Sequence, residues 1–440
     1  MYICGDFVTQ VSCSDDNFLK RLFDTVLFNK MSKTSLTNRK YLVPFILITT
    51  LFFLWGFARS MLDVLNQHFK DTLNISITQS SLVQVCSYLA YFMMALPAGI
   101  FISRFGYRRG VVFGLLLFAA GAFLFIPGAQ VESFSVYLGA LFIIACGLAF
   151  LETAANPYST LLGPKETATS RLNLSQSFNG LGSSLGPLIM GGYLFSQADA
   201  DLSIPYAVMG GVVAIVAVIF SRVNLPEIQN EEESVEVEAS KHPIKMLLSN
   251  RMFLFGLLAL LAYEVSEISI NSYFVLFVTG MGWLAADGAS YVLGLSLFIF
   301  MGGRFLGSWI MRTVKPARML SWCAAGSILS MILILLTSSS VQNDTSWTRY
   351  LPIAFLMVNY LCESIMFPTI YSMALNYVPS RLVGRAGSIL MMTPVGGCAF
   401  LLMGMMADNI GYILPFFLPL CGFVVVLAFA IYSRMSKASV

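Results

Sequence analysis

Long apolar stretches alternate with short polar ones over most of the chain. A helix of about 20 apolar residues crosses the hydrocarbon core of a bilayer. The pattern predicts twelve such helices, at residues 41–69, 80–103, 109–127, 136–160, 171–196, 204–222, 252–279, 288–311, 318–337, 350–377, 382–406 and 411–433. Because a helix satisfies its own backbone groups in lipid, we expect an all-α membrane protein with twelve transmembrane helices.

One long polar interval divides these helices into two groups of six. It carries a run of glutamates, which is typical of a solvated linker. We therefore predict a cytoplasmic N-terminal tail at 1–40, an N-terminal six-helix half at 41–222, a cytoplasmic linker at 223–251, a C-terminal six-helix half at 252–434 and a cytoplasmic tail at 435–440. The first 40 residues lack the apolar core of a signal peptide. Met31 offers an alternative start, so we predict that residues 1–30 are dispensable.

Composition and charge support a membrane protein. Hydrophobic residues make up 57% of the chain and charged residues 11%, against about 25% charged residues in ordinary globular proteins. The net charge of +3 is too small, and the basic residues too dispersed, to indicate a nucleic-acid partner. If the N-terminus is cytoplasmic, 22 of the 26 Lys and Arg residues lie on the cytoplasmic side. This asymmetry predicts that both termini are cytoplasmic.

Motifs for enzymatic chemistry are missing from the sequence. The eight cysteines form no CxxC pair, and the two histidines are far apart, so we expect no disulfide, metal site or cofactor. There is no Walker motif, Rossmann fingerprint or HExxH sequence. The sequence therefore supports neither ATP hydrolysis nor a metalloenzyme, and we expect a protein that is not an enzyme.

The two halves repeat each other. Glu152 precedes Pro157 by five residues, and Glu363 precedes Pro368 by five residues, so the two glutamates lie 211 residues apart. An internal repeat with six spans per half is the architecture of secondary transporters, whose site lies between the halves near mid-membrane.

Glu152 lies in the second half of a predicted membrane helix. A charge in hydrocarbon costs about 2.5–3.5 kcal/mol on insertion scales, so such residues face a protein interior or water. Asn156 is four positions later and shares the helical face, and Pro157 can bend or end the helix there. The alternative is a structural carboxylate that is bound to a neighbouring helix.

The first predicted helix turns amphipathic after Phe57. Arg59, Asp63, Asn66, Gln67 and Lys70 share one face. This pattern is compatible with a helix end that emerges into water. Because the residues that flank Asp63 are apolar, we prefer a cavity-facing Asp63 with Arg59 one turn below it.

The fifth predicted helix carries a polar stripe of Asn173, Gln176, Asn179 and Ser183. Amides and hydroxyls both donate and accept hydrogen bonds, which suits a polyhydroxylated ligand. The alternative is that they join helices to one another. We favour ligand contact for Gln176 and Asn179, and leave both interpretations open for Asn173.

The C-terminal half carries two comparable stripes. The seventh helix has Tyr263, Glu267, Asn271 and Phe274 on one face, and the tenth has Asn359, Glu363, Met366, Phe367 and Ile370. Aromatic rings in such helices more often pack in the core. Beside buried polar groups, however, a ring can lie against the apolar face of a sugar. We therefore predict substrate contacts at Glu267, Asn271 and Phe367.

A membrane carboxylate can also load a proton on one side and release it on the other as its surroundings change. Asp63 and Glu152 are the best candidates for this role in the N-terminal half.

From Tyr41 to Arg434 the sequence resembles the fucose:proton symporter branch of the major facilitator superfamily, which includes L-fucose and glucose/galactose permeases. The motifs are Phe-Phe-Leu-Trp at 52–55 with Asp63 eight residues later, Leu-Glu-Thr-Ala-Ala-Asn-Pro at 151–157, Arg-Leu-Asn-Leu-Ser-Gln-Ser-Phe-Asn at 171–179, Gly-Arg-Phe-Leu-Gly at 303–307 and Phe-Pro-Thr-Ile-Tyr-Ser at 367–372. The resemblance implies a major facilitator fold that works by alternating access.

The resemblance also implies roles for particular residues. Asp63 and Glu152 look like the family's acidic pair, with Glu152 as proton carrier and Asp63 coupling sugar binding to the conformational change. Gln176 and Asn179 look like cavity residues. L-fucose permease has amides where this chain has Arg59 and Ser60, and a glutamine at each of the positions of Glu267 and Met366. Glu267 and the Ser-Ile-Met-Phe-Pro run at 364–368 look closer to the glucose/galactose members.

The prediction is therefore a proton-coupled importer of a hexose or 6-deoxyhexose in a bacterial inner membrane, contacting lipid, sugar and proton, and monomeric as is usual for this family. We place Arg59, Asn156, Gln176, Asn179, Glu267, Asn271 and Phe367 in its substrate site. The alternatives are sodium-coupled or uncoupled sugar transport, in which Arg59 pairs with Asp63 and weakens proton dependence, and a membrane sugar sensor that does not transport.

Overall fold

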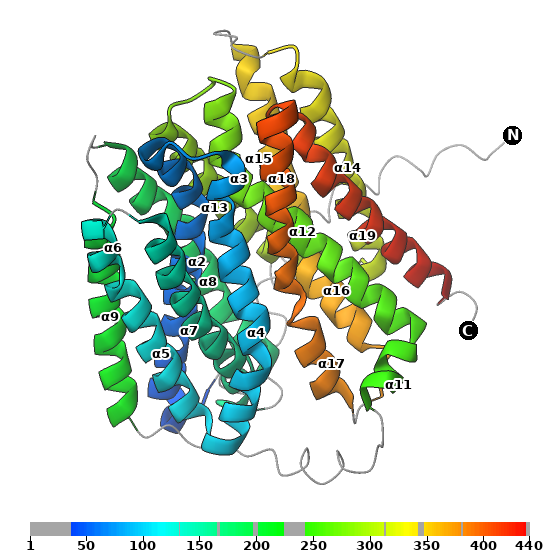
Figure 1. Cartoon of the computed structure of the whole chain (residues 1–440). Coiled ribbons are helices and arrows are strands. Elements are labelled where there is room, and N and C mark those ends of the chain that lie inside the picture. The colour runs from blue at the N-terminus through cyan, green and yellow to red at the C-terminus, as the bar shows by residue number, and fades with distance from the viewer. Residues whose placement is uncertain are drawn as a thin grey trace, which may run out of the picture.

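Figure 1 shows the computed structural model of the chain, which describes residues 37–131, 133–164, 168–196, 201–223, 243–311, 314–341, 347–379 and 382–436. The alternative start at Met31 and the glutamate run of the linker lie outside these residues.

The described residues are almost entirely helical. Ten of their helical segments are long and apolar enough to cross a bilayer. These segments contain α2 (Leu42–Leu73), α4 (Leu82–Phe105), α5 (Tyr107–Phe123) with α6 (Phe125–Val131), α7 (Phe134–Leu161), α9 (Ser203–Arg222), α12 (Arg251–Gly280), α13 (Ala286–Ile310), α14 (Pro316–Ser338), α15 (Leu351–Glu363) with α16 (Met366–Leu375), and α19 (Phe417–Ser436). The shorter elements are η1 (Arg39–Tyr41), α3 (Ile77–Ser80), α11 (Pro243–Ser249), η4 (Trp347–Tyr350) and η7 (Leu414–Phe416).

Two further predicted spans are helical but differ from a simple apolar helix. The fifth is α8 (Ala168–Ser196), in which the polar stripe lowers the hydropathy. The eleventh is divided into α17 (Val383–Leu390), the 3₁₀ helix η6 (Thr393–Ala399) and α18 (Phe400–Ile410). With these two, the described part of the chain makes the twelve passes that the hydropathy pattern predicts. Pro157 does not end its helix, because α7 continues to Leu161.

Buried apolar side chains form two large clusters. One extends from Phe45 to Phe220, and the other from Leu247 to Ala430 with Ile77 added from α3. In Figure 1, α2 to α9 lie on the left, α12, α14, α16, α17 and α19 lie further right, and α13 lies next to α8. Below we call α2 to α9 the N-terminal half and α11 to α19 the C-terminal half.

The outer surface of the bundle is apolar. Ile100 is 67% exposed, Val208 63% and Leu336 65%. Exposure of so many large apolar side chains is unfavourable in water but natural against lipid tails, which are themselves apolar. The surface therefore supports a protein that spans a membrane.

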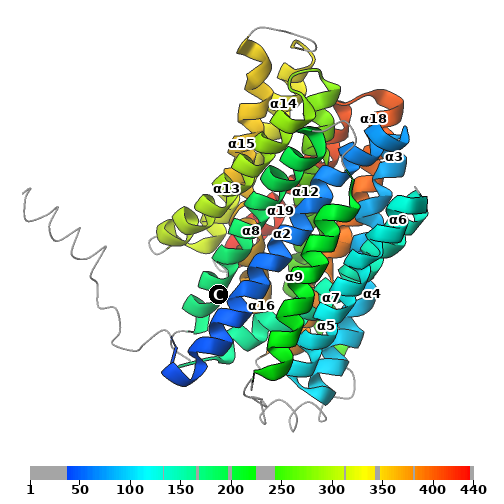
Figure 2. The same cartoon turned by 90° about the vertical axis from the view of Figure 1, so that its left-hand side faces the viewer.

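The halves meet along several pairs of helices, of which α8 and α13 form the longest seam. Both cartoon views place these two helices side by side (Figures 1 and 2). Glycines allow the close approach: a Cβ on Gly191 of α8 would collide with Ser290 of α13, and one on Gly294 would collide with Leu188. Small residues at such contacts let two membrane helices pack closely.

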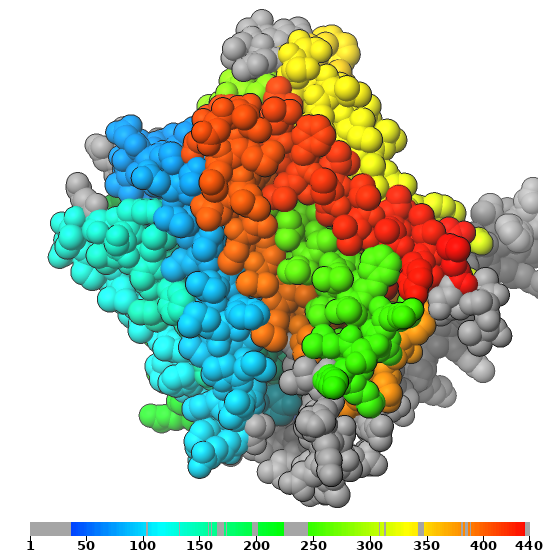
Figure 3. Space-filling view, turned by 45° about the vertical axis from the view of Figure 1, so that its right-hand side comes forward, coloured from blue at the N-terminus to red at the C-terminus, as the bar shows by residue number. Residues whose placement is uncertain are grey.

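The bundle has two ends. At the linker end α2 begins, α4 ends and α12 begins, and α2 and α12 end at the opposite end (Figure 1). At the opposite end, the surfaces of α3 and α4 meet those of α18 and η6 directly (Figure 3).

At the end of the bundle opposite the linker, one carboxylate links the two halves by hydrogen bonds. Asp408 of α18 accepts hydrogen bonds from the backbone N–H groups of Ile77 (3.1 Å) and Thr78 (2.7 Å) and from the Thr78 hydroxyl (2.6 Å). We call these three residues the end latch. Nearby, the Lys70 ammonium donates to the Tyr412 hydroxyl at 3.1 Å. A carboxylate is well suited to free backbone N–H groups because its charge matches their dipoles.

Candidate functional site

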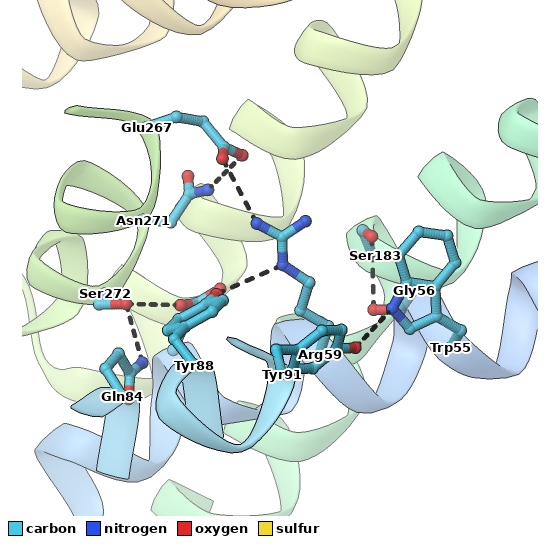
Figure 4. A network of polar contacts seen from close by, with 11 residues as sticks. Trp55, Gly56, Arg59, Gln84, Tyr88, Tyr91, Ser183, Glu267, Asn271 and Ser272 are labelled. Atoms are coloured by element: carbon cyan, nitrogen blue, oxygen red, sulfur yellow. Dashed lines mark hydrogen bonds and ion pairs between the residues drawn. The ribbon is translucent and has the colours of Figure 1, made fainter. Parts of the chain in front are cut away.

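Arg59 crosses from one half to the other near the middle of the bundle. It lies on α2, and its Nη2 is 3.4 Å from Oε2 of Glu267 on α12, which is the one ion pair among the residues that the structure describes. Its Nε donates to the Tyr88 hydroxyl at 3.3 Å, and its guanidinium lies 5.9 Å from the centre of the Tyr88 ring. Figure 4 shows Arg59 held between Tyr88 and Glu267. The sequence left a pair with Asp63 open; the structure pairs Arg59 with Glu267 instead.

Asp63 lies one turn further along α2 and is also in contact with the other half. Its Oδ1 accepts a hydrogen bond of 2.9 Å from the Ser272 hydroxyl of α12. Gln84 of α4 donates in turn to the Ser272 oxygen at 2.8 Å. Asp63 is only 7% exposed, and that it faces a cavity stays a prediction. It is buried at the seam, where the hydroxyl satisfies an oxygen that would otherwise be costly to bury.

Glu267 and Asn271 lie on the same face of α12, as the spacing predicts. The Asn271 amide donates to Glu267 Oε1 at 2.9 Å, so both oxygens of this carboxylate have partners. The predicted aromatic neighbour is present too, because the Phe367 ring lies 6.3 Å from that of Tyr263. The structure therefore brings together the predicted residues of the C-terminal half.

Glu152 lies on α7 in the N-terminal half and is half-buried. Among the described residues, no hydrogen bond or ion pair to its carboxylate is found. One turn later, Asn156 accepts a hydrogen bond of 3.2 Å from the Gln176 amide of α8. The two amides thus lie side by side as expected, and the acid near them is free of protein partners, as a group that exchanges a proton must be at some stage.

Asn179 has a structural contact. Its amide donates to the backbone oxygen of Phe52 at 3.1 Å, and Ser183 donates to that of Gly56 at 3.3 Å. These bonds join α8 to α2, which is the role that the sequence weighed against ligand contact. Asn179 is half-buried, and its Oδ1 is not used by this bond. The side chain of Asn173 lies outside what the structure describes.

Sequence reasoning missed several members of this network. Tyr88 and Gln84 lie one turn apart on α4, and Ser272 follows Asn271 directly. A glutamine within an otherwise apolar span is a detectable signal for Gln84. Ser272 gave no such signal, because a serine in a membrane helix usually bonds to the backbone of its own preceding turn. Tyr91, which accepts a 2.9 Å hydrogen bond from the Trp55 indole, was also missed.

The arrangement defines a class of protein. A bundle of twelve passes in two halves, with acids, amides and an arginine gathered at the middle of the seam, is the architecture of a secondary transporter. More particularly, residues 48–400 match the family model of the Major Facilitator Superfamily, and the chain belongs to that family.

Named relatives extend over most of the chain. It is 33% identical over 411 residues to a glucose/galactose transporter of Brucella abortus (strain 2308), covering 89% of this chain and 94% of the relative. It is 34% identical over 416 residues to an L-fucose-proton symporter of Haemophilus influenzae, covering 86% and 94%. Among solved structures it is similar to FucP, a Major Facilitator Superfamily transporter in the outward conformation, with a TM-score of 0.65 and 27% identity over 90% of this chain and 99% of that one.

Proposed function

We propose that this protein imports a hexose or 6-deoxyhexose of the glucose, galactose or L-fucose type by proton symport with alternating access. The observation that carries the proposal is the polar chain at mid-bundle. An acid of one half, Asp63, is hydrogen-bonded to Ser272 of the other. Relatives named as glucose/galactose transporters and L-fucose-proton symporters supply the substrate class.

We propose that this conformation is inward-facing. We propose that both termini and the linker are cytoplasmic, in a bacterial inner membrane, with six-helix halves at 41–222 and 252–434 in a monomer. The linker end is then the cytoplasmic end. The end latch and the Asp63–Ser272 bond join the halves at the opposite end and at the middle, so the exit to the outside is closed.

The proton enters this scheme through the two acids of the N-terminal half. When the halves separate at the opposite end, Asp63 loses its donor Ser272 and meets outside water. Outside water then supplies the proton that Asp63 takes up, and the sugar binds in the same state. Glu152, whose carboxylate has no hydrogen bond or ion pair to the described residues, is the group that passes the proton to the cytoplasmic side.

The remaining predicted residues form the sugar site in this proposal. Arg59, Asn156, Gln176, Asn179, Glu267 and Asn271 offer donors and acceptors for hydroxyls, and Phe367 offers an apolar face. Arg59 and Glu267 bond to each other in this structure. A sugar that reaches both must replace that ion pair with its own hydroxyls, so sugar binding is tied to the contact between halves.

Uptake into proteoliposomes tests the proposal. The liposomes receive an inward proton gradient and one of several labelled sugars: L-fucose, D-glucose, D-galactose, D-mannose or N-acetylglucosamine. Accumulation of one sugar that collapses with a protonophore is the expected result. Accumulation that follows a sodium gradient instead, or exchange without accumulation, refutes proton coupling and favours the sodium-coupled or uncoupled alternative. Binding without any exchange favours a sensor.

A further inference from the structure

A further buried acid, Glu363, lies in the C-terminal half and takes no part in the network described above. It is the last residue of α15 and is fully buried. In the internal repeat it corresponds to Glu152, from which it is 211 residues distant. The acid of one repeat thus has a counterpart in the other.

The surroundings of Glu363 suit a carboxylic acid and not a carboxylate. Its Oε2 accepts one hydrogen bond, 2.9 Å long, from the Asn359 amide. Among the described residues, its Oε1 has no hydrogen-bond partner, and the same holds for Asn359 Oδ1 and the Tyr360 hydroxyl, all on residues that are fully buried. An uncompensated buried charge costs several kcal/mol, so the neutral, protonated acid is the form that this site stabilises.

Arg304, the basic residue of this region, contacts groups other than the Glu363 carboxyl group. Arg304 of α13 donates from Nε to the backbone oxygen of Ser364 at 3.3 Å, and its guanidinium lies 4.7 Å from the centre of the Phe300 ring. The charged and titratable groups that face this region are Glu267, Glu264 and Tyr263 from α12, Asp63 from α2, Arg304 from α13, Cys323 from α14, and Tyr360 and Cys362 from α15 itself. Among the described residues, no cation pairs with Glu363.

Glu363 also lies at a break in its helix. Pro368 has no N–H group, so the Ser364 oxygen four residues before it lacks its helical donor. The helix is interrupted at Ser364 and Ile365 and resumes as α16 at Met366. Arg304 supplies the missing donor. Discontinuous helices are where transporters place coupling-ion sites, because a change of angle at the break changes what the site contacts.

From the repeat, the partnerless oxygen and the helix break, we propose that Glu363 is a second proton-binding site of the transport cycle. It holds a proton on Oε1 in this conformation. When α16 changes its angle to α15, the O–H bond breaks, the proton passes to cytoplasmic water, and the carboxylate that remains is protonated again from outside water in the outward-facing state. This proposal rests on the proposed proton symport for its role in the cycle, but the protonation of Glu363 can be measured without transport.

Infrared spectroscopy of the purified protein tests the protonation. At neutral pH, the spectrum of the wild type minus that of Glu363→Gln should contain the C=O stretch of a protonated carboxyl group. Asp201→Asn, which removes an exposed carboxylate, is the matched control and should take away only carboxylate bands. A carboxylate band in the Glu363 difference overturns the proposal. If Glu363→Gln does not fold, Asn359→Ala, which removes the donor to Oε2, should shift the protonated band, and no shift overturns it.

Proton stoichiometry tests the role in transport. The proton-to-sugar ratio follows from the sugar gradient that balances a set proton gradient at zero net flux. Glu363→Gln should carry one proton fewer per sugar than the wild type. Glu264→Gln, the same change on α12, should leave the ratio unaltered. An unchanged ratio in Glu363→Gln refutes the second site. A wild type without proton coupling refutes the proposed function, while the infrared result still decides whether Glu363 is protonated.

Discussion

Replacing Asp408 with alanine should loosen the closed end of the molecule. This carboxylate accepts three hydrogen bonds, two from the backbone N–H groups of Ile77 and Thr78 and one from the Thr78 hydroxyl. The bonds link α18 of one half to α3 of the other. Their loss therefore affects the inward-facing state and leaves the outward-facing state, in which the ends are apart, unchanged.

The size of the effect follows from the geometry. Removing a side chain that caps backbone N–H groups costs about 0.5–2 kcal/mol. Asp408 is exposed, where water competes for the donors, so we expect about 1 kcal/mol, or a roughly fivefold change in the ratio of closed to open molecules. Asn keeps one acceptor oxygen, and Asp408→Asn should retain part of the latch.

Amide hydrogen exchange measures this directly, because two of the donors are backbone N–H groups. In Asp408→Ala, exchange at Ile77 and Thr78 should become about fivefold faster. Exchange should also rise around Thr279, whose hydroxyl donates to Gln67 across the seam at 3.1 Å, if the whole end opens.

Asp201 provides the matched control. It accepts hydrogen bonds from the backbone and hydroxyl of Ser203, at 2.8 and 2.7 Å, within the N-terminal half. Asp201→Ala should speed exchange near Ser203 and leave the C-terminal half as it was. Unchanged exchange at Ile77 and Thr78 in Asp408→Ala would refute the latch. Faster exchange confined to α3, with none around Thr279, would mean local fraying and not separation of the halves.

Three further predictions concern the site. Glu152→Gln should abolish uphill uptake but keep counterflow exchange of sugar; loss of both would indicate a structural carboxylate. Asp63→Asn should impair exchange as well, since the acid couples sugar binding to the movement of the halves, and wild-type exchange would refute that role. Arg59→Leu and Glu267→Gln should each weaken sugar binding, and the double variant should lose less than the sum because the two side chains share one ion pair; additive losses would show that they act separately.

Hydropathy predicted the helices well because lipid leaves the backbone few options. The eleventh span is the exception, since it is not one continuous helix. It is interrupted at η6, where Pro394 lacks an N–H group and Gly397 packs against the Tyr88 ring so closely that a Cβ would overlap it. Only the position of α4 in three dimensions makes that glycine necessary, and the hydropathy of the span does not contain it.

The sequence predicted which site residues share a helical face, but not which residues of the other half they contact. Helical spacing correctly grouped Glu267 with Asn271 and set Arg59 and Asp63 one turn apart. It could not show that Arg59 pairs with Glu267, or Asp63 with Ser272, because these partners are about half a chain away and meet only when the halves pack. Which residue of one half meets which residue of the other also depends on the conformation, which no local pattern specifies.

The seam of α8 and α13 has a mechanical consequence. Gly191 and Gly294 carry no side chains, and each faces a side chain of the opposite helix, Ser290 against Gly191 and Leu188 against Gly294. Because the helices lie so close together here, we expect the halves to tilt about this line, with the ends of the bundle moving through larger distances than its centre. A bulkier residue in place of Gly191 or Gly294 would push α8 and α13 apart. It would slow each transport cycle for any sugar and any coupling ion.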